Sequence, residues 1–107
     1  MKLLTEELLA QLPPLYSSER NCDPKVIVHC FMAYSCYSAY FWEFDGEDTL
    51  FGAVSLGEGF ELGYSSLEEI QSAKGPLGLS IERDLYFRQR PVSEIPALED
   101  IRQYCVS

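Results

Sequence analysis

Two apolar runs that meet at Asp45-Gly46 constrain this chain more than any other feature of its sequence. Residues 37–44 and 49–56 alternate in a way that predicts β-strands, because successive side chains of a strand point to opposite faces. One face of the first run carries Tyr40, Trp42 and Phe44. Asp-Gly readily adopts the positive φ angles of a tight hairpin turn. The sequence therefore predicts a central β-hairpin.

The same period of two extends this hairpin into a meander of consecutive strands. Residues 25–34 predict a preceding strand that is apolar on both faces and hence covered on both sides. One of its faces carries Val26, Val28, Cys30, Met32 and Tyr34. After the hairpin, Gly57-Glu58-Gly59 predicts a turn into a further strand over residues 60–64.

Two helices are predicted by their capping residues. Thr5 caps the first, which ends before Pro13-Pro14 because neither proline can continue the hydrogen-bond ladder. Ser66 and Glu69 form a capping box that opens the second, which is expected to run to about Lys74.

The end of the chain predicts one more strand and one more helix. The strand covers residues 81–88, and Ser93 or Pro96 opens the helix. The resulting order of elements predicts an α+β fold: a single domain, residues 1–107, with an antiparallel sheet of about five strands and short N-terminal, middle and C-terminal helices.

The acidic balance of the chain restricts its partners. The net charge of −9 argues against direct nucleic-acid binding, whose affinity comes mainly from lysine and arginine. No run approaches the roughly 18 apolar residues of a membrane span. Glu6 and Glu7 stand where a signal peptide would have its apolar core. We therefore expect a cytoplasmic protein that binds neither membranes nor nucleic acid directly.

The four cysteines, Cys22, Cys30, Cys36 and Cys105, are expected to be free thiols. Without an export signal, reducing conditions disfavour disulfides. Their spacing lacks the two close pairs typical of a zinc site. The acidic turn at residues 45–48 lacks the longer ligand run of a calcium loop. The sequence therefore predicts no metal and no cofactor.

Charge is distributed unevenly along the chain. No lysine or arginine lies between Lys25 and Lys74, although this segment contains most of the aromatic residues. One interpretation is a face that docks on a basic protein surface, with aromatic anchors and acids that steer the encounter. The other is a solvated sheet face whose aromatic residues form the core. The expected partner-binding residues are Glu43, Asp45, Glu47, Asp48, Glu58, Glu61, Trp42 and Tyr40.

His29 is the only histidine, so any base-assisted serine or cysteine nucleophile would have to use it. The neighbouring Cys30 points to the other face of the strand. Such a pair therefore requires Cys36 or a serine to arrive from across the sheet. A histidine in an apolar strand is more often a packed residue bonded to a neighbour, and we expect no catalytic residues and no enzyme activity.

Several stretches of the chain resemble a known family. They lie at residues 1–8, 12–16, 63–70 and 78–87, and the last contains the string Ile-Glu-Arg-Asp-Leu-Tyr-Phe. They resemble the family catalogued as domain of unknown function 2958. The resemblance implies a small single-domain protein of bacterial plasmids, phages and other mobile elements, often encoded among anti-defence genes. It implies no assigned activity, so no catalytic residues can be carried over.

These observations lead to one first hypothesis and two alternatives. The first is a non-enzymatic protein of a mobile element that inhibits a host defence complex, of the anti-CRISPR or anti-restriction type, by binding its basic surface. One alternative is a small-molecule or nucleotide-binding domain, or a weak hydrolase, with a cleft near His29. The other is a structural accessory of plasmid or phage transfer.

Overall fold

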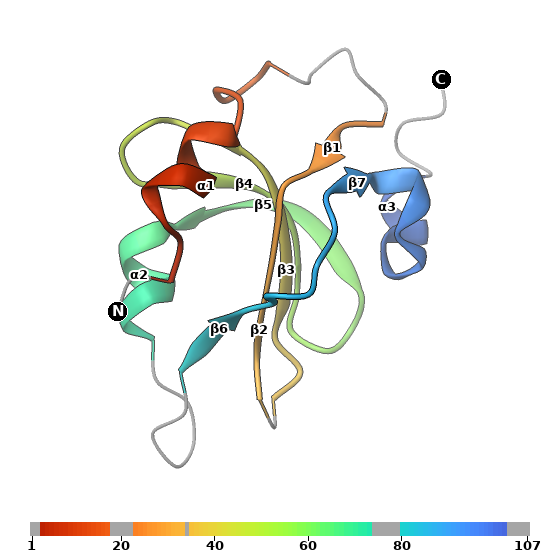
Figure 1. The fold of residues 1–107 in the computed structure, drawn as a ribbon. Coiled ribbons are helices and arrows are strands. Elements are labelled where there is room, and N and C mark those ends of the chain that lie inside the picture. The colour runs from red at the N-terminus through yellow and green to blue at the C-terminus, as the bar shows by residue number, and fades with distance from the viewer. Residues whose placement is uncertain (1–2, 18–22, 34, 74–79, 103–107) are drawn as a thin grey trace.

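A computed structural model of the protein describes residues 3–17, 23–33, 35–73 and 80–102. Its centre is a five-stranded sheet in the order β5-β4-β3-β2-β6, in which every neighbouring pair is antiparallel (Figure 1). The strands are β2 (Val28–Met32), β3 (Ser38–Phe44), β4 (Thr49–Ser55), β5 (Phe60–Ser66) and β6 (Ile81–Arg83). The predicted α+β fold, with its central hairpin and meander, is confirmed.

The expected strand over residues 25–34 is wrong as a continuous element. It is divided at Ile27 into β1 (Lys25–Val26) and β2. Ile27 donates its N–H to the carbonyl of Phe41, but β1 leaves the sheet and pairs with β7 (Arg90–Pro91). As a result, Val26 and Val28 lie in different apolar clusters, not on one shared face.

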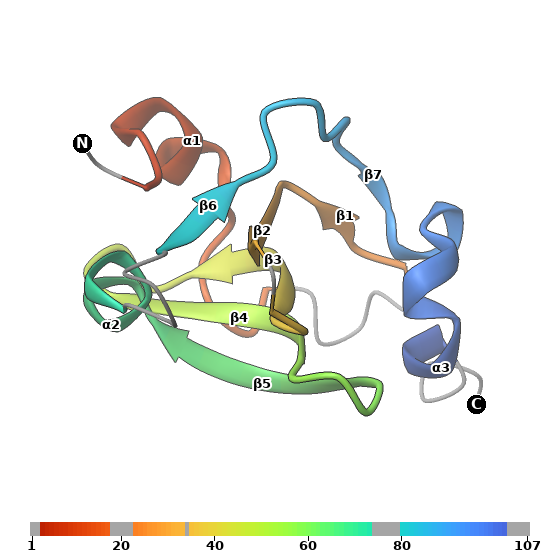
Figure 2. The same cartoon turned by 90° about the horizontal axis from the view of Figure 1, so that it is seen from below.

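The expected strand over residues 81–88 is also interrupted. β6 pairs with β2 only as far as Arg83, and residues 84–89 then cross to the separate ribbon of β1 and β7. Asp84 donates its N–H to the carbonyl of His29, which holds the start of this crossing against β2. Figure 2 shows the crossing as an arch between β6 and β7.

The two predicted helix caps are confirmed. Thr5 accepts a hydrogen bond from the N–H of Leu8 at the start of α1 (Glu6–Gln11). Ser66 accepts one from the N–H of Glu69 at the start of α2 (Leu67–Ser72). The expected end of α2 at Lys74 lies outside the described residues.

The C-terminal helix is less regular than expected. Two 3₁₀ turns, η2 (Val92–Glu94) and η3 (Pro96–Leu98), precede the short helix α3 (Glu99–Arg102). Cys105, which was expected on the apolar stripe of this helix, lies outside the described residues. No helix among the described residues is long and apolar enough to cross a membrane.

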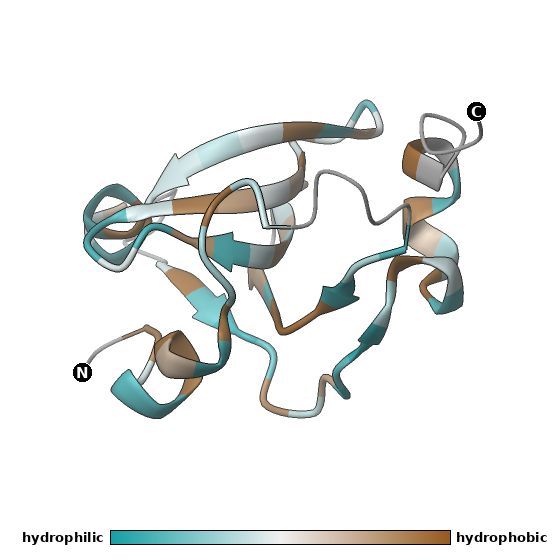
Figure 3. Cartoon of the chain, turned by 90° about the horizontal axis from the view of Figure 1, so that it is seen from above, coloured by the Kyte–Doolittle hydropathy of each residue, from teal (hydrophilic) through white to brown (hydrophobic). Residues whose placement is uncertain are grey.

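Two apolar cores hold these elements together, one on each side of the sheet. The first core includes Leu4, Val28, Phe41, Phe44, Leu50 and Ile70, and Leu8 and Leu9 of α1 pack against it, so that it joins α1 and α2 to the strands. The second core includes Val26, Trp42, Ala53, Val92, Leu98 and Ile101, which join the C-terminal turns to the strands. Figure 3 shows apolar segments along the central strands and hydrophilic residues at the outer turns.

A bulge in β3 corrects the predicted faces of this strand. Phe41 pairs with Gly52 but Glu43 pairs with Phe51, so one extra residue lies on β3 between them. This residue is Trp42, which packs in the second core, whereas Phe44 packs in the first. The expectation that Trp42 and Phe44 share a face is therefore wrong, because the bulge reverses the alternation.

Candidate functional site

Two of the residues expected at a partner surface lie in the interior. Only 3% of the surface of Trp42 and of Glu43 is exposed. Trp42 packs edge-on against Phe51, with ring centroids 5.8 Å apart. Glu43 Oε1 accepts a 2.8 Å hydrogen bond from the N–H of Tyr16, a residue with a positive φ of 67°. Both side chains hold the fold together and are inaccessible to a partner.

Asp45 organises the hairpin turn between β3 and β4. Its Oδ1 accepts hydrogen bonds from the N–H groups of Glu47 and Asp48, each at 2.8 Å, and from that of Thr49 at 3.0 Å. These N–H groups, those of Glu47 and Asp48 above all, hold the pKa of Asp45 below its ordinary value. Asp45 is exposed, but its carboxylate is engaged by its own turn.

Asp48 helps to cap α2, which begins 19 residues later in the chain. Its Oδ2 accepts a hydrogen bond from the hydroxyl of Ser66 at 2.5 Å, and its Oδ1 accepts one from the N–H of Glu68 at 2.8 Å. The carbonyl of Asp48 accepts a third, from the N–H of Leu67. Ser66 was predicted as the cap of α2, but no local pattern indicates that Asp48 would complete it.

The remaining acids of the expected surface, Glu47, Glu58 and Glu61, are exposed. Glu61 lies in β5, the outermost strand of the sheet, and Glu58 lies in the turn that precedes it. Three apolar side chains near them are also exposed: Leu56 by 78%, Leu62 by 45% and Tyr64 by 55%. We call these five residues, Leu56, Glu58, Glu61, Leu62 and Tyr64, the β5 edge surface; together they line a shallow hollow.

Tyr40, the last of the expected partner residues, is half-buried and belongs to a different cluster. Its ring stacks on that of His29, with centroids 4.2 Å apart and an interplanar angle of 11°. Burial raises the pKa of Tyr40. Phe60 and Phe87 contact Tyr40 at tilted angles, and Phe87 also contacts His29. The expected site therefore divides into exposed acids on β5 and an aromatic layer around His29.

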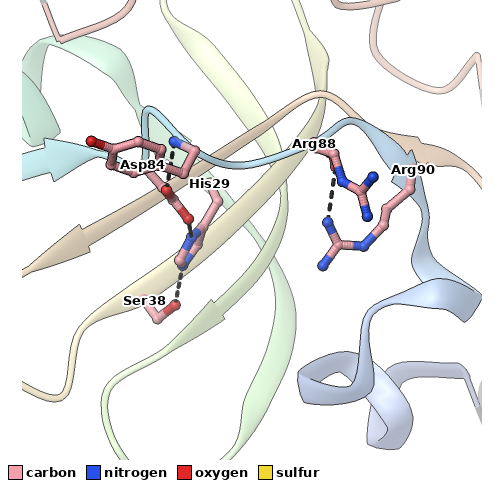
Figure 4. Close-up of polar contacts among 6 residues, drawn as sticks. His29, Ser38, Asp84, Arg88 and Arg90 are labelled. Carbon is pink, nitrogen blue, oxygen red and sulfur yellow. Dashed lines mark hydrogen bonds and ion pairs between the residues drawn. The ribbon is translucent and has the colours of Figure 1, made fainter.

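His29 joins two polar residues that are far from it in the sequence. Its Nδ1 lies 3.0 Å from Asp84 Oδ2, and its Nε2 lies 2.8 Å from Ser38 Oγ (Figure 4). The register explains this meeting. His29 pairs with Tyr40, and Ser38 lies two residues before Tyr40 and so on the same face. A serine thus arrives from across the sheet, as a nucleophile assisted by His29 requires.

The hydrogen bonds of Asp84 define the proton positions in this network. Burial raises the pKa of Asp84, but the hydrogen bonds from His29 and from the N–H of Tyr86 outweigh it, so that the pKa lies below its ordinary value. Ionised Asp84 only accepts hydrogen bonds, so Nδ1 of His29 carries the proton that it receives. In the neutral ring, Nε2 is then free to accept a hydrogen bond from the Ser38 hydroxyl.

The guanidinium of Arg90, near this network, is held by the backbone of its own segment. Arg90 donates to the carbonyls of Arg88 and Glu94 at 3.1 and 3.3 Å, and its guanidinium carbon lies 5.1 Å from the centre of the Phe87 ring. Figure 4 shows Arg88 at the end of the crossing segment and Arg90 in β7, both apart from His29 and Ser38. The contacts of Arg90 therefore tie the start of β7 to the turn that follows it.

Metal-binding residues do not gather in the part of the chain that the structure describes: no three His, Cys, Asp or Glu side chains there could hold an ion together. Cys30 is buried, which raises its pKa to about 12, and Cys36 is exposed; neither forms a disulfide. Cys22 and Cys105 lie outside the described residues.

Comparison with known proteins relates the chain to one family. A family model described as "Protein of unknown function (DUF2958)" matches residues 3–98. The matched residues include the stretches at 12–16, 63–70 and 78–87 on which the sequence resemblance rests, and the resemblance is thereby confirmed. No curated protein and no solved structure matches the chain.

Proposed function

The chain belongs to the DUF2958 family, whose name assigns no activity. We therefore propose a function from the surface of the protein itself. The protein is a binding protein, and its β5 edge surface docks a basic, extended segment of a partner protein. One observation carries this proposal. Among the described residues no strand pairs with the outer side of β5. A strand edge of this kind offers unpaired N–H and C=O groups to an added strand.

The side chains of β5 favour a basic partner with some apolar residues. Leu62 and Tyr64 pair with Ala53 and Phe51, so they lie on the face of the second core, whereas Glu61 lies on the opposite face. An added strand would therefore meet apolar groups on one face and a carboxylate on the other. Edges that avoid association usually carry lysine or proline, and β5 has neither.

The charge of the whole molecule supports the same class of partner. A net charge of −9 attracts basic surfaces over long range and accelerates encounter. Nucleic-acid-binding complexes carry such surfaces, because they must neutralise phosphates. The family resemblance implies a protein that is encoded among the anti-defence genes of mobile elements. We therefore propose that the partner is a host defence complex of the cytoplasm.

Charge reversal on the edge tests the proposal. Tagged protein captures its partner from host cells, and the double variant Glu58→Lys with Glu61→Lys is compared with Glu7→Lys with Glu82→Lys. The control changes the net charge equally on exposed residues of α1 and β6. We expect the first variant to lose the partner and the control to retain it. Equal capture by both variants would contradict the proposal.

Hydrogen exchange of the purified complex tests the mode of binding. Amides of β5 should exchange more slowly in the complex than in the free protein, because strand addition pairs its outer edge. Amides of β6, the other edge of the sheet, should be unchanged. Protection of β6 with β5 unchanged would place the partner elsewhere and refute the docking mode.

A further inference from the structure

The arrangement of Ser38, His29 and Asp84 goes beyond a docking function. A serine hydroxyl is a weak nucleophile unless an adjacent base accepts its proton, and that base is usually oriented by a third group. The two contacts, at 2.8 and 3.0 Å, fall within the range that proton transfer requires. Such constellations are recognised by geometry and roles, whatever the order of the residues in the chain.

The side-chain network is not the only contact between β2 and the crossing segment. The start of the crossing segment is already held by the backbone hydrogen bond from Asp84 to His29. In addition, the side chains of Asp84, His29 and Ser38 form two consecutive hydrogen bonds, one between the acid and the base and one between the base and the hydroxyl. All three residues are partly open to solvent; the side chains of His29 and Asp84 are exposed by 15% and 28%, and Ser38 is half-buried. The network is therefore not sealed from solvent.

We propose that Ser38 is a nucleophile activated by His29, with Asp84 as a positioning residue, and that it takes acyl groups from small activated esters. Ser38 Oγ bonds to the ester carbonyl carbon while its proton passes to Nε2 of His29. The ester C–O bond then breaks, and the proton leaves with the departing oxygen. Water attacks the acyl-serine by the same route, which releases the acid and restores Ser38.

The surroundings of His29 define the kind of ester. Phe31, Tyr40 and Phe87 border the ring of His29, at centroid distances of 6.0, 4.2 and 6.0 Å. Aromatic walls of this kind favour an ester with a flat, apolar group. Ionised Asp84 favours the transient positive charge on His29 and disfavours anionic substrates.

Covalent labelling tests the proposal on the whole chain. A fluorophosphonate probe forms a bond from Ser38 Oγ to phosphorus as the P–F bond breaks, and fluoride leaves while His29 takes the proton. Peptide mass spectrometry should locate one adduct, on Ser38, and none on the half-buried Ser65 of β5. Adducts spread over several serines at equal rates, or no adduct on Ser38, would refute the proposal.

Matched variants separate activation from a structural contribution. His29→Gln can still hydrogen-bond to Ser38 but has no titratable base, so labelling should fall by about 100-fold or more. Asp84→Asn can donate to Nδ1, which moves the ring proton to Nε2 and should also slow labelling. Thermal melting checks that each variant folds. Unchanged labelling in folded His29→Gln would overturn the assignment.

Two variants test whether labelling of Ser38 and binding of the partner use separate sites. The Glu58→Lys, Glu61→Lys variant leaves Ser38, His29 and Asp84 intact, so it should lose the partner and keep its labelling rate. Ser38→Ala should lose labelling and keep the partner. Loss of both properties in Ser38→Ala that melts like the native protein would contradict the separation of the two sites.

Discussion

At the scale of single residues, burial decides what an acidic side chain can do. Glu43 belongs to the same acidic segment as Glu58 and Glu61, yet it is 97% removed from solvent and accepts a hydrogen bond from the backbone of Tyr16. Replacing Glu43 by alanine should cost about 1–3 kcal/mol of the free energy of unfolding, since the partly buried N–H of Tyr16 loses a charged acceptor. Urea denaturation measures this cost. Glu47→Ala, on the exposed turn, should change stability by no more than about 0.5 kcal/mol, and equal costs for the two would contradict this account.

Asp84 gives a second prediction at this scale, on the dependence of stability on pH. Its pKa is lower in the folded protein than its ordinary value, so the unfolded chain binds more protons in the intervening range. The stability that Asp84 contributes is therefore complete above its ordinary pKa of about 4 and is lost as the pH falls through the lower, folded value. Melting temperatures measured between about pH 6 and pH 2 should fall less steeply in Asp84→Asn than in the native protein. Parallel curves would contradict the prediction. Asp45, whose pKa is also lowered, keeps part of the acid dependence in the variant.

At the scale of elements, two strands approach so closely that they tolerate only glycine at one position. A Cβ atom on Gly52 of β4 would lie 1.9 Å from the carbonyl oxygen of Tyr40 and 2.8 Å from the Cα of Phe41. Gly52→Ala should therefore push β4 away from β3 and cost about 1–3 kcal/mol.

Gly63 of β5 is the matched control, because it pairs directly with Gly52 and a Cβ there would meet no atom within 4 Å. Gly63→Ala should be neutral or should stabilise the protein by up to about 1 kcal/mol, since glycine in a strand loses more conformational freedom on folding. Thermal or urea unfolding of both variants checks the contrast. A cost for Gly63→Ala as large as that for Gly52→Ala would indicate a different packing of the sheet.

At the scale of the whole molecule, the net charge of −9 acts on folding and on binding in opposite directions. Salt screens exposed charges beyond about 8 Å at physiological ionic strength. Added salt should therefore raise the melting temperature, by relieving repulsion among the acids, and weaken binding to a basic partner. In the Glu58→Lys, Glu61→Lys variant the net charge becomes −5, because each change adds two positive charges, and the rise in melting temperature should be smaller. A salt series of melting temperatures and binding rates measures both effects. A native protein whose partner binds equally well at all salt concentrations would contradict the electrostatic part of the proposal.

The sequence by itself determined the features that depend on neighbouring residues. Thr5 and Ser66 cap helices through N–H groups three residues ahead, and the Asp45 carboxylate holds the hairpin turn by accepting from N–H groups two to four residues ahead. Each of these contacts spans a few residues, so its geometry follows from the residues themselves. The alternation of apolar residues likewise predicted the meander of β2 to β5, and with it the α+β fold.

Only the tertiary structure decided which distant residues meet. The bulge at Trp42 separates it from Phe44, and the division at Ile27 sends Val26 and Val28 to different cores. Asp48 completes the cap of α2, and Ser38 and Asp84 meet at His29. The physical reason is common to all of them: one residue added to or removed from a strand exchanges its two faces, and contacts across the sheet depend on register and crossing. No local pattern carries this information, so the acids predicted to share one surface divide between the interior, the turn and the β5 edge.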